Sequence, residues 1–312
     1  MENKMLHRFT SAGLVFAFLI SFSFCAWPHS MYFFLPPGSV GAGEQEMKAL
    51  AHAYPVRISQ VAMHDGDWAV EVDGEWFFWA HGRILPEPQR TEWKRYLPRW
   101  DIYNYSIGTL PPIPQLDAQA ESELNKMLKD ARLHPPRKSD DFLNRLFDAG
   151  SRRETKSHLV TVDFLGFPVS VHQRIAGALQ SVAAECLALR QTDPQVAAFF
   201  KSLAHIEGYS YRDVTGTHYR SYHSYGLAVD LIPKSYGGKA AYWHWNWVMH
   251  KSSRWWTTPY TQRWMVPLSI VSAFERNGFI WGGKWMFFDN MHFVYRPEIL
   301  SLAREQMIPP SK

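Results

Sequence analysis

The sequence pattern of residues 68–132 predicts a hairpin, an extended linker and a helix. Residues 68–79 alternate apolar and polar positions on either side of Asp73-Gly74, a pair that favours a two-residue hairpin turn, and they predict two antiparallel strands. The proline-rich residues 109–115 predict an extended linker. Residues 117–132 predict a charged helix with Asp117 as its N-cap, and the prolines just after it end the helix.

The C-terminal half mixes helical and strand patterns. Helices are predicted for residues 140–149 (closed by Gly150), 172–190, 194–205 and 265–277. Strands are predicted for two segments around Gly166 within 161–171, and for 227–232 and 291–295. Because helices precede and separate only a few strands, we expect an α+β fold with a small, mostly antiparallel sheet flanked by helices. The residues before about 136 differ from this half in sequence pattern, and we expect them to form an N-terminal accessory module.

The first 25 residues have the composition of a secretory signal peptide. Lys4 and Arg8 provide a basic start, residues 9–25 are apolar, and Ser23 to Cys25 offer a small-x-small cleavage site. Two alternatives stay open, an uncleaved membrane anchor and lipidation of Cys25. We therefore expect an exported protein of a bacterial periplasm or cell envelope that touches a membrane only through this segment.

Composition narrows the chemistry further. The 312 residues are 46% hydrophobic and 20% charged, which is typical of a chain that forms a core. A formal net charge of +4 without a concentrated basic stripe argues against nucleic acid as a partner. Two cysteines exclude a cysteine-rich zinc site, so any metal must be held by histidine and carboxylate. Cys186 continues an apolar helical stripe and is predicted to pack in the core.

Three polar residues interrupt apolar strand patterns. Asp230 lies in the middle of the predicted strand 227–232, His223 precedes that strand by a few residues, and His292 lies in the last predicted strand. A buried carboxylate is costly unless it is paired or binds a metal. Two histidines and one aspartate suit an open zinc site with three protein ligands. Taken singly, each residue is better explained as a hydrogen-bonded core histidine or a capping aspartate.

Taken together, these residues form a recognisable pattern. Residues 221–230 read Ser-x-His-x-x-Gly-x-Ala-x-Asp, and Asp289-Asn-Met-His292 completes the set 62 residues after Asp230. The pattern resembles the VanY-type zinc D-alanyl-D-alanine carboxypeptidases, whose relatives include D-Ala-D-Ala dipeptidases and phage L-Ala-D-Glu endopeptidases. Residues 279–285 are similar to a second motif of that family. The resemblance covers roughly residues 155–300 and implies a hedgehog/DD-peptidase-like fold.

The resemblance implies a role for each matching residue. The zinc ligands would be His223, Asp230 and His292, and the general base would be Asp289. Arg212 matches the arginine that polarises the scissile carbonyl in the family.

Two further positions bear on the substrate. Ser221 would hydrogen-bond the substrate near the metal, and Arg220 is a candidate for a substrate carboxylate, although a solvated loop residue is as good an explanation. Val294 departs from the family pattern, where glutamate is common, and this leaves specificity open. The aromatic residues 242–247 and Trp255-Trp256 fit either the wall of a substrate groove or, for 242–247, a half-buried strand.

The expected organisation is a signal peptide (1–25), an accessory module of unknown function (26–135) and a catalytic domain (136–312). The expected activity is that of a Zn²⁺-dependent peptidase acting on peptidoglycan stem peptides, with removal of a terminal D-Ala favoured. Two alternatives are an L-Ala-D-Glu endopeptidase and a non-catalytic cell-wall-binding protein that retains the fold. No stable protein partner is implied.

Overall fold

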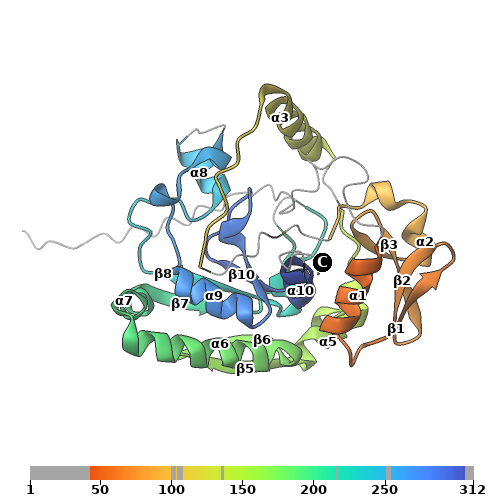
Figure 1. Ribbon diagram of the computed structural model, residues 1–312, viewed down its shortest axis with the longest axis horizontal. Coiled ribbons are helices and arrows are strands. Elements are labelled where there is room, and N and C mark those ends of the chain that lie inside the picture. Colours follow the sequence, from red (N-terminus) through yellow and green to blue (C-terminus); the bar gives the residue numbers. More distant parts are fainter. Residues whose placement is uncertain are drawn as a thin grey trace, which may run out of the picture.

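The C-terminal half of the protein is built on a four-stranded antiparallel sheet (Figure 1). In the computed structural model its strands lie in the order β7 (Leu203–Glu207), β8 (Ala228–Pro233), β10 (His292–Tyr295) and β9 (Phe279–Trp281). β8 and β10 form the central pair, and nearly all of their side chains are buried. The structure describes residues 43–99, 103, 108–134, 137–214, 217–250 and 254–305.

Helices and a hairpin cover this sheet. They are α6 (Gln173–Thr192), α7 (Pro194–Ser202), α9 (Leu268–Arg276) and the hairpin of β5 (Leu159–Phe164) and β6 (Phe167–His172). The ring of Phe274 in α9 stacks on that of Phe293 in β10, with 3.9 Å between the ring centroids. Cys186 of α6 is buried in the same core, as predicted, and burial raises the pKa of its thiol to about 12. The α+β fold expected from the sequence is therefore confirmed.

The N-terminal region forms a second sheet at the opposite end of the molecule from α7 (Figure 1). Its elements are α1 (Glu44–Ala53), β1 (Ile58–His64), β2 (Asp67–Val72), β3 (Glu75–Ala80), β4 (Arg83–Pro86) and α2 (Glu87–Arg90), followed by the 3-10 helix η2 (Trp93–Arg95). The four strands form an antiparallel meander. The predicted hairpin is β2 and β3, and its turn residues Asp73 and Gly74 have φ of 49° and 78°, as a type I′ turn requires.

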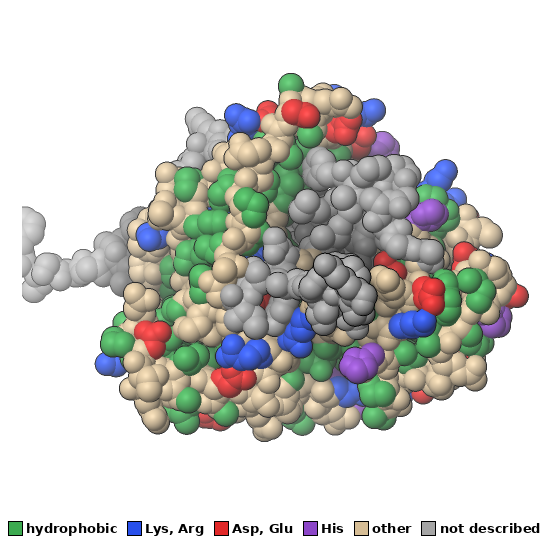
Figure 2. Space-filling model, viewed as in Figure 1, with side chains coloured by type: hydrophobic (Ala, Val, Ile, Leu, Met, Phe, Trp, Pro, Cys, Tyr) green, Lys and Arg blue, Asp and Glu red, His purple; other side chains and the backbone are tan. Residues whose placement is uncertain are grey.

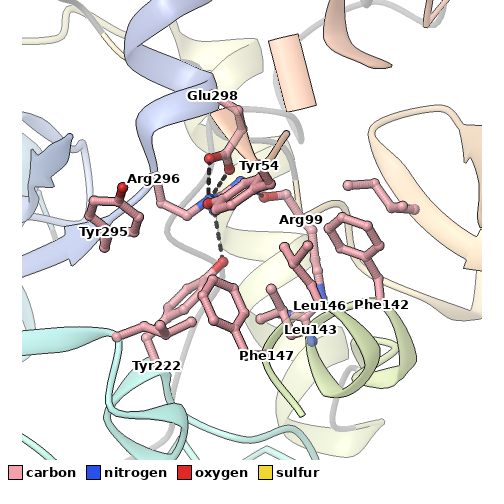
Figure 3. Close-up of a pocket in the computed structure, with 12 residues that line it drawn as sticks. Tyr54, Arg99, Phe142, Leu143, Leu146, Phe147, Tyr222, Tyr295, Arg296 and Glu298 are labelled. Atoms are coloured by element: carbon pink, nitrogen blue, oxygen red, sulfur yellow. Dashed lines mark hydrogen bonds and ion pairs between the residues drawn. The ribbon is translucent and has the colours of Figure 1, made fainter. Parts of the chain in front are cut away.

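The N-terminal sheet is attached to the C-terminal half through buried polar side chains (Figure 3). Tyr54, just after α1, donates to Glu298 at 2.9 Å, and Glu298 lies in α10 (Pro297–Glu305). Arg296 also pairs with Glu298, and its guanidinium donates to the hydroxyl of Tyr222 at 2.7 Å and to the carbonyl of Arg99 at 3.0 Å. These bonds join the N-terminal region to the segment that carries His223.

A separate apolar cluster lies under the helix α3 (Ala118–Leu133) and beside α8 (Trp243–His250). It contains Leu124, Leu128, Trp243, Trp255, Trp256, Phe287 and Phe288. Asp117 caps α3 as predicted, because its side chain accepts a hydrogen bond from Ala120 N at 2.8 Å. Figure 2 shows acidic and basic side chains interspersed over the described part of the visible face.

Three predicted elements differ from the structure. The helix α4 (Asp141–Phe147) ends at Asp148, whose φ is 49°, and not at Gly150; Asp148 pairs there with Arg57 and Arg174. The segment 194–205 divides into α7 and the strand β7, because Leu203 pairs with β8. Residues 243–250 are the helix α8 and not a strand.

The remaining short elements connect these parts. They are α5 (Arg152–Ser157) and the 3-10 helices η3 (Tyr222–Tyr225), η4 (Trp255–Thr257), η5 (Tyr260–Gln262) and η6 (Gly282–Lys284). The predicted signal peptide, residues 1–25, lies outside the described residues. Within the described part of the chain, none of the helices combines the length and the apolar character that crossing a membrane requires.

Candidate metal centre

His223 lies in η3 (Tyr222–Tyr225), in the loop that leads into β8. The hydroxyl of Ser221 accepts a hydrogen bond from His223 N at 3.3 Å and caps this short helix. Gly226 ends it with a φ of 71°, and a Cβ at this position would lie 2.7 Å from the backbone nitrogen of His172. Only glycine fits both the left-handed backbone and the close approach to β6, so the loop that carries His223 is held in one conformation.

Asp230 and His292 meet because they are cross-strand partners. Residue 230 of β8 lies directly opposite residue 292 of the antiparallel strand β10. Opposed residues of an antiparallel pair have Cβ atoms about 4.5–5.5 Å apart on one face of the sheet, so their side chains interact directly. The register of the two central strands thus brings together two polar residues that are 62 positions apart in the sequence.

The three side chains converge on one point. His223 Nε2 lies 3.1 Å from Asp230 Oδ2, His292 Nδ1 lies 2.7 Å from Asp230 Oδ1, and the two nitrogens are 3.2 Å apart. Two ligands of a tetrahedral zinc ion with bonds of ~2.0–2.1 Å are separated by roughly 3.3 Å. A search of the described residues for histidine, cysteine and carboxylate side chains close enough to share a metal ion finds this group of three.

The hydrogen bond on the far side of His223 fixes its tautomer. Nδ1 lies 2.6 Å from the carbonyl oxygen of Gly208, which can only accept, so Nδ1 carries the proton. The lone pair of Nε2 is then directed toward Asp230 and His292. An outer hydrogen bond from a ligating histidine to a backbone carbonyl is usual in metal sites, because it sets the orientation of the ring.

Burial and the mutual charges of the cluster set the pKa values of its three residues. Burial disfavours the Asp230 carboxylate, but the two facing imidazoles outweigh burial and hold its pKa far below the usual range. Burial lowers the pKa of His292, which favours the neutral imidazole that a metal requires. For His223, the nearby Asp230 charge outweighs burial and raises the pKa.

Asp289 lies beside the three residues, on the loop before β10. Its backbone nitrogen donates to Gly282 O at 3.0 Å, and its Oδ1 accepts from Met291 N at 3.3 Å. A Cβ on Gly282 would lie 2.5 Å from the carbonyl oxygen of Asp289, so this turn also requires glycine. Burial and the negative charge of Asp230 raise the pKa of Asp289 well above its ordinary value, so this carboxylate is more basic than a free aspartate.

A cavity of about 230 Å³ opens at this cluster. All six residues predicted for the site line it: Arg212, Ser221, His223, Asp230, Asp289 and His292. Arg212 is half exposed, and its Nη1 donates to Glu207 Oε1 at 2.7 Å. The structure therefore places the arginine in the wall of the same cavity as the metal cluster and pairs it with a carboxylate that the sequence pattern did not indicate.

Arg220 has a structural role. Its guanidinium donates to Asn144 Oδ1 at 2.9 Å and to Ser224 O at 2.8 Å, and it lies 4.0 Å from the ring centroid of Tyr225. A guanidinium held by this many protein groups is not available for a substrate carboxylate, and the predicted alternative of a solvated loop residue is also wrong. Val294 is buried in the main core.

The structure decides between the two interpretations of the aromatic segment and adds a lining residue that sequence reasoning missed. Tyr242 and Trp245 line the cavity from the start of α8, so part of the aromatic segment does form a wall, whereas Trp255 and Trp256 are buried in the second cluster. Lys138 joins them from a segment more than 80 residues before the motif. No spacing rule connects these residues with the metal cluster, because only the tertiary fold brings them together.

Comparison with known families matches two separate segments of the chain to different families. Residues 215–295 match the family described as D-alanyl-D-alanine carboxypeptidase, and this segment contains the three clustered residues and Asp289. Residues 46–100 match a family described as a domain of unknown function (DUF8518). No curated protein and no solved structure gives a significant match to the chain. The first match supports a peptidase of this family and does not single out the VanY type.

Proposed function

We propose that the protein is an exported zinc peptidase that removes the terminal D-Ala from peptidoglycan stem peptides. The observation that carries this proposal is the convergence of His223, Asp230 and His292 at ligand spacing in the wall of a cavity that also contains Asp289. A metal triad alone would fit many proteins. A triad with a second carboxylate, Asp289, beside it has the parts that metal-assisted hydrolysis needs, namely metal ligands and a proton acceptor.

The residues have distinct tasks. His223, Asp230 and His292 would hold Zn²⁺, which when bound supplies a Lewis acid for the scissile carbonyl and for water. The Asp289 carboxylate takes a proton from the attacking water and returns it to the leaving amine as the C–N bond breaks. Arg212 stabilises the negative charge that develops on the carbonyl oxygen.

The size of the cavity fits the end of a short peptide. Its volume of about 230 Å³ is below the ~300–1,000 Å³ that is usual for drug-sized ligands. The aromatic side chains Tyr242 and Trp245 supply an apolar wall, which is suited to small alkyl groups such as the methyl of alanine. Peptidoglycan lies outside the cytoplasm, so this function requires residues 1–25 to direct export.

Mass spectrometry of digested stem pentapeptides tests the proposal. Zinc-loaded protein should release one D-Ala, and the loss should disappear in a His223→Ala, His292→Ala double variant. His218→Ala is the matched control, because His218 is exposed and lies outside the cavity lining. A cut between L-Ala and D-Glu would support the endopeptidase instead, and binding without turnover would support a cell-wall-binding protein.

A further inference from the structure

Arg212 differs from the other residues of the proposed mechanism because it lies outside the segment 215–295 that matches the carboxypeptidase family. Its main chain is fastened to the loop that carries His223. The hydroxyl of Ser224, which is fully buried, accepts a hydrogen bond from Arg212 N at 2.7 Å and also bonds to Arg212 O. Ser221 N donates to the same carbonyl at 3.1 Å. These bonds fix the backbone of Arg212 beside the metal cluster, so the side-chain conformation decides where the guanidinium lies.

The side chain of Arg212 is anchored by Glu207, the last residue of β7. Arg212 Nη1 donates to Glu207 Oε1 at 2.7 Å, and no other hydrogen bond of this guanidinium is found in the described part of the chain. Nε and Nη2 remain as donors for a group in the cavity that Arg212 lines. Glu207 is not part of that lining, so we do not expect it to touch a substrate.

The position of Glu207 follows from the register of the sheet. Residue 207 of β7 lies opposite Asp230 of β8, and Asp230 lies opposite His292 of β10. Opposed residues of antiparallel strands share one face, so these three side chains form a row across the sheet. The next residue, Gly208, accepts the hydrogen bond of His223 Nδ1 with its carbonyl oxygen. The end of β7 therefore sets both the arginine and a proposed metal ligand in place.

Stability does not explain the pair of Arg212 and Glu207. Their side chains are 42% and 36% exposed, and exposed ion pairs contribute little to folding. The protein contains a closely matched pair of Arg276 and Glu185, whose side chains are 43% and 35% exposed. Neither residue of this second pair lines the cavity. The two pairs thus differ in whether the arginine reaches the candidate site, and the second serves as an internal control.

We infer that Glu207 is a positioning residue, which holds the guanidinium of Arg212 in the orientation that stabilises charge on the scissile carbonyl oxygen. This inference rests on the proposed function, because it assigns a support to a residue of that mechanism. A donor that is fixed before the reaction needs no reorganisation when charge develops. Without Glu207 the arginine side chain samples several rotamers, and a displacement of about 1 Å can lower the rate by ~10²-fold.

Steady-state hydrolysis of a stem pentapeptide by the zinc-loaded, full-length protein gives the first test. Glu207→Ala should lower kcat by ~10–100-fold and leave KM nearly unchanged, because the oriented guanidinium acts in the transition state. Glu207→Gln keeps an acceptor for Arg212 Nη1 and should recover part of the loss. Glu185→Ala, in the matched pair, should leave kcat unchanged.

A double-mutant cycle separates positioning from a general structural role. When Arg212→Ala is already present, Glu207→Ala should have no further effect on kcat, because no guanidinium is left to hold. A structural defect would instead lower kcat by the same factor in both backgrounds.

A second test needs neither turnover nor a bound metal. The ¹⁵N relaxation of the Nε–H group of Arg212 reports its motion on the ps–ns timescale, and Arg212→Lys identifies the signal by its disappearance. The group should be ordered in the wild type and flexible in Glu207→Ala. Glu185→Ala should not alter it.

Two results would overturn the inference. One is an Arg212 Nε–H group that is equally mobile with and without the Glu207 carboxylate. The other is a loss of kcat from Glu207→Ala that is the same in both backgrounds. If the wild-type protein cleaves no peptide but Glu207→Ala frees the arginine, the positioning of Arg212 holds and the proposed function fails. If the wild type cleaves the peptide and Glu207→Ala retains full kcat, the peptidase function holds and the inference fails.

Discussion

Asp289→Asn separates the proposed chemistry from the fold. The side chain of asparagine has the same shape, and its Oδ1 can still accept the hydrogen bond that Met291 N donates at 3.3 Å. The turn before β10 and the metal cluster should therefore persist. The variant loses the negative charge and the ability to take a proton.

The expected loss of activity follows from the role of a general base. Removing such a group costs ~10²–10⁴-fold in rate, which corresponds to about 3–5 kcal/mol of transition-state stabilisation. Zinc binding should be retained, because His223, Asp230 and His292 are unchanged.

The same substitution should stabilise the metal-free protein. Burial and repulsion by Asp230 raise the pKa of Asp289 in the folded state, so ionising this group opposes folding. For a carboxyl group with a raised folded-state pKa, the wild-type protein loses stability as pH rises above the unfolded value of ~3.9. The loss grows by about 1.4 kcal/mol for each pH unit until the folded-state pKa is reached. Asparagine removes this contribution.

Two assays on one pair of proteins test both effects. Steady-state hydrolysis of a stem pentapeptide measures the rate, and thermal unfolding after metal removal at pH 4 and pH 7 measures stability. Asp289→Asn should melt close to the wild type at pH 4 and above it at pH 7. Asp130→Asn, on the exposed side of α3, is the control for removing a carboxylate. Near-normal turnover, or a lower melting temperature at pH 7, would refute the reasoning.

Three further predictions concern the loop, the arginine and the N-terminus. Gly226→Ala should destabilise the protein by at least about 1–2 kcal/mol because of its left-handed backbone, whereas Gly177→Ala in α6, where nothing lies within 4 Å, should be neutral or stabilising in denaturant titrations. Arg212→Ala should retain zinc and lower kcat by ~10²–10³-fold, and an unchanged kcat would remove it from the mechanism. Residues 1–40 should export a fused reporter, deletion of residues 9–25 should retain the protein inside the cell, and a cytoplasmic, unprocessed full-length protein would exclude the wall substrate.

Local sequence signals predicted most of the individual elements. The Asp73-Gly74 hairpin and the Asp117 cap each depend on a few neighbouring residues, so a short stretch of sequence is enough to predict them. The metal cluster could also be predicted from the sequence, because Asp230 and His292 interrupt apolar strands. Polar groups in such positions require a partner.

Features that depend on tertiary packing could not be predicted from the sequence. The alternation of aromatic residues near Trp245 is typical of a strand, but the segment is helical because α8 packs on a cluster with α3. Leu203 leaves its helix to pair with β8, a partner far along the chain. Lys138 lines the cavity from a segment whose neighbouring residues hydrogen-bond to Leu97 and Arg99, and no pattern within that segment indicates this.

The metal content of the purified protein tests the central claim most directly. Elemental analysis of the wild-type chain should give one zinc per molecule, and the His223→Ala, His292→Ala double variant should contain almost none. His218→Ala should match the wild type. Stoichiometric zinc in the double variant, or a wild-type protein that binds no zinc when it is supplied, would contradict the assignment of His223, Asp230 and His292 as a metal site.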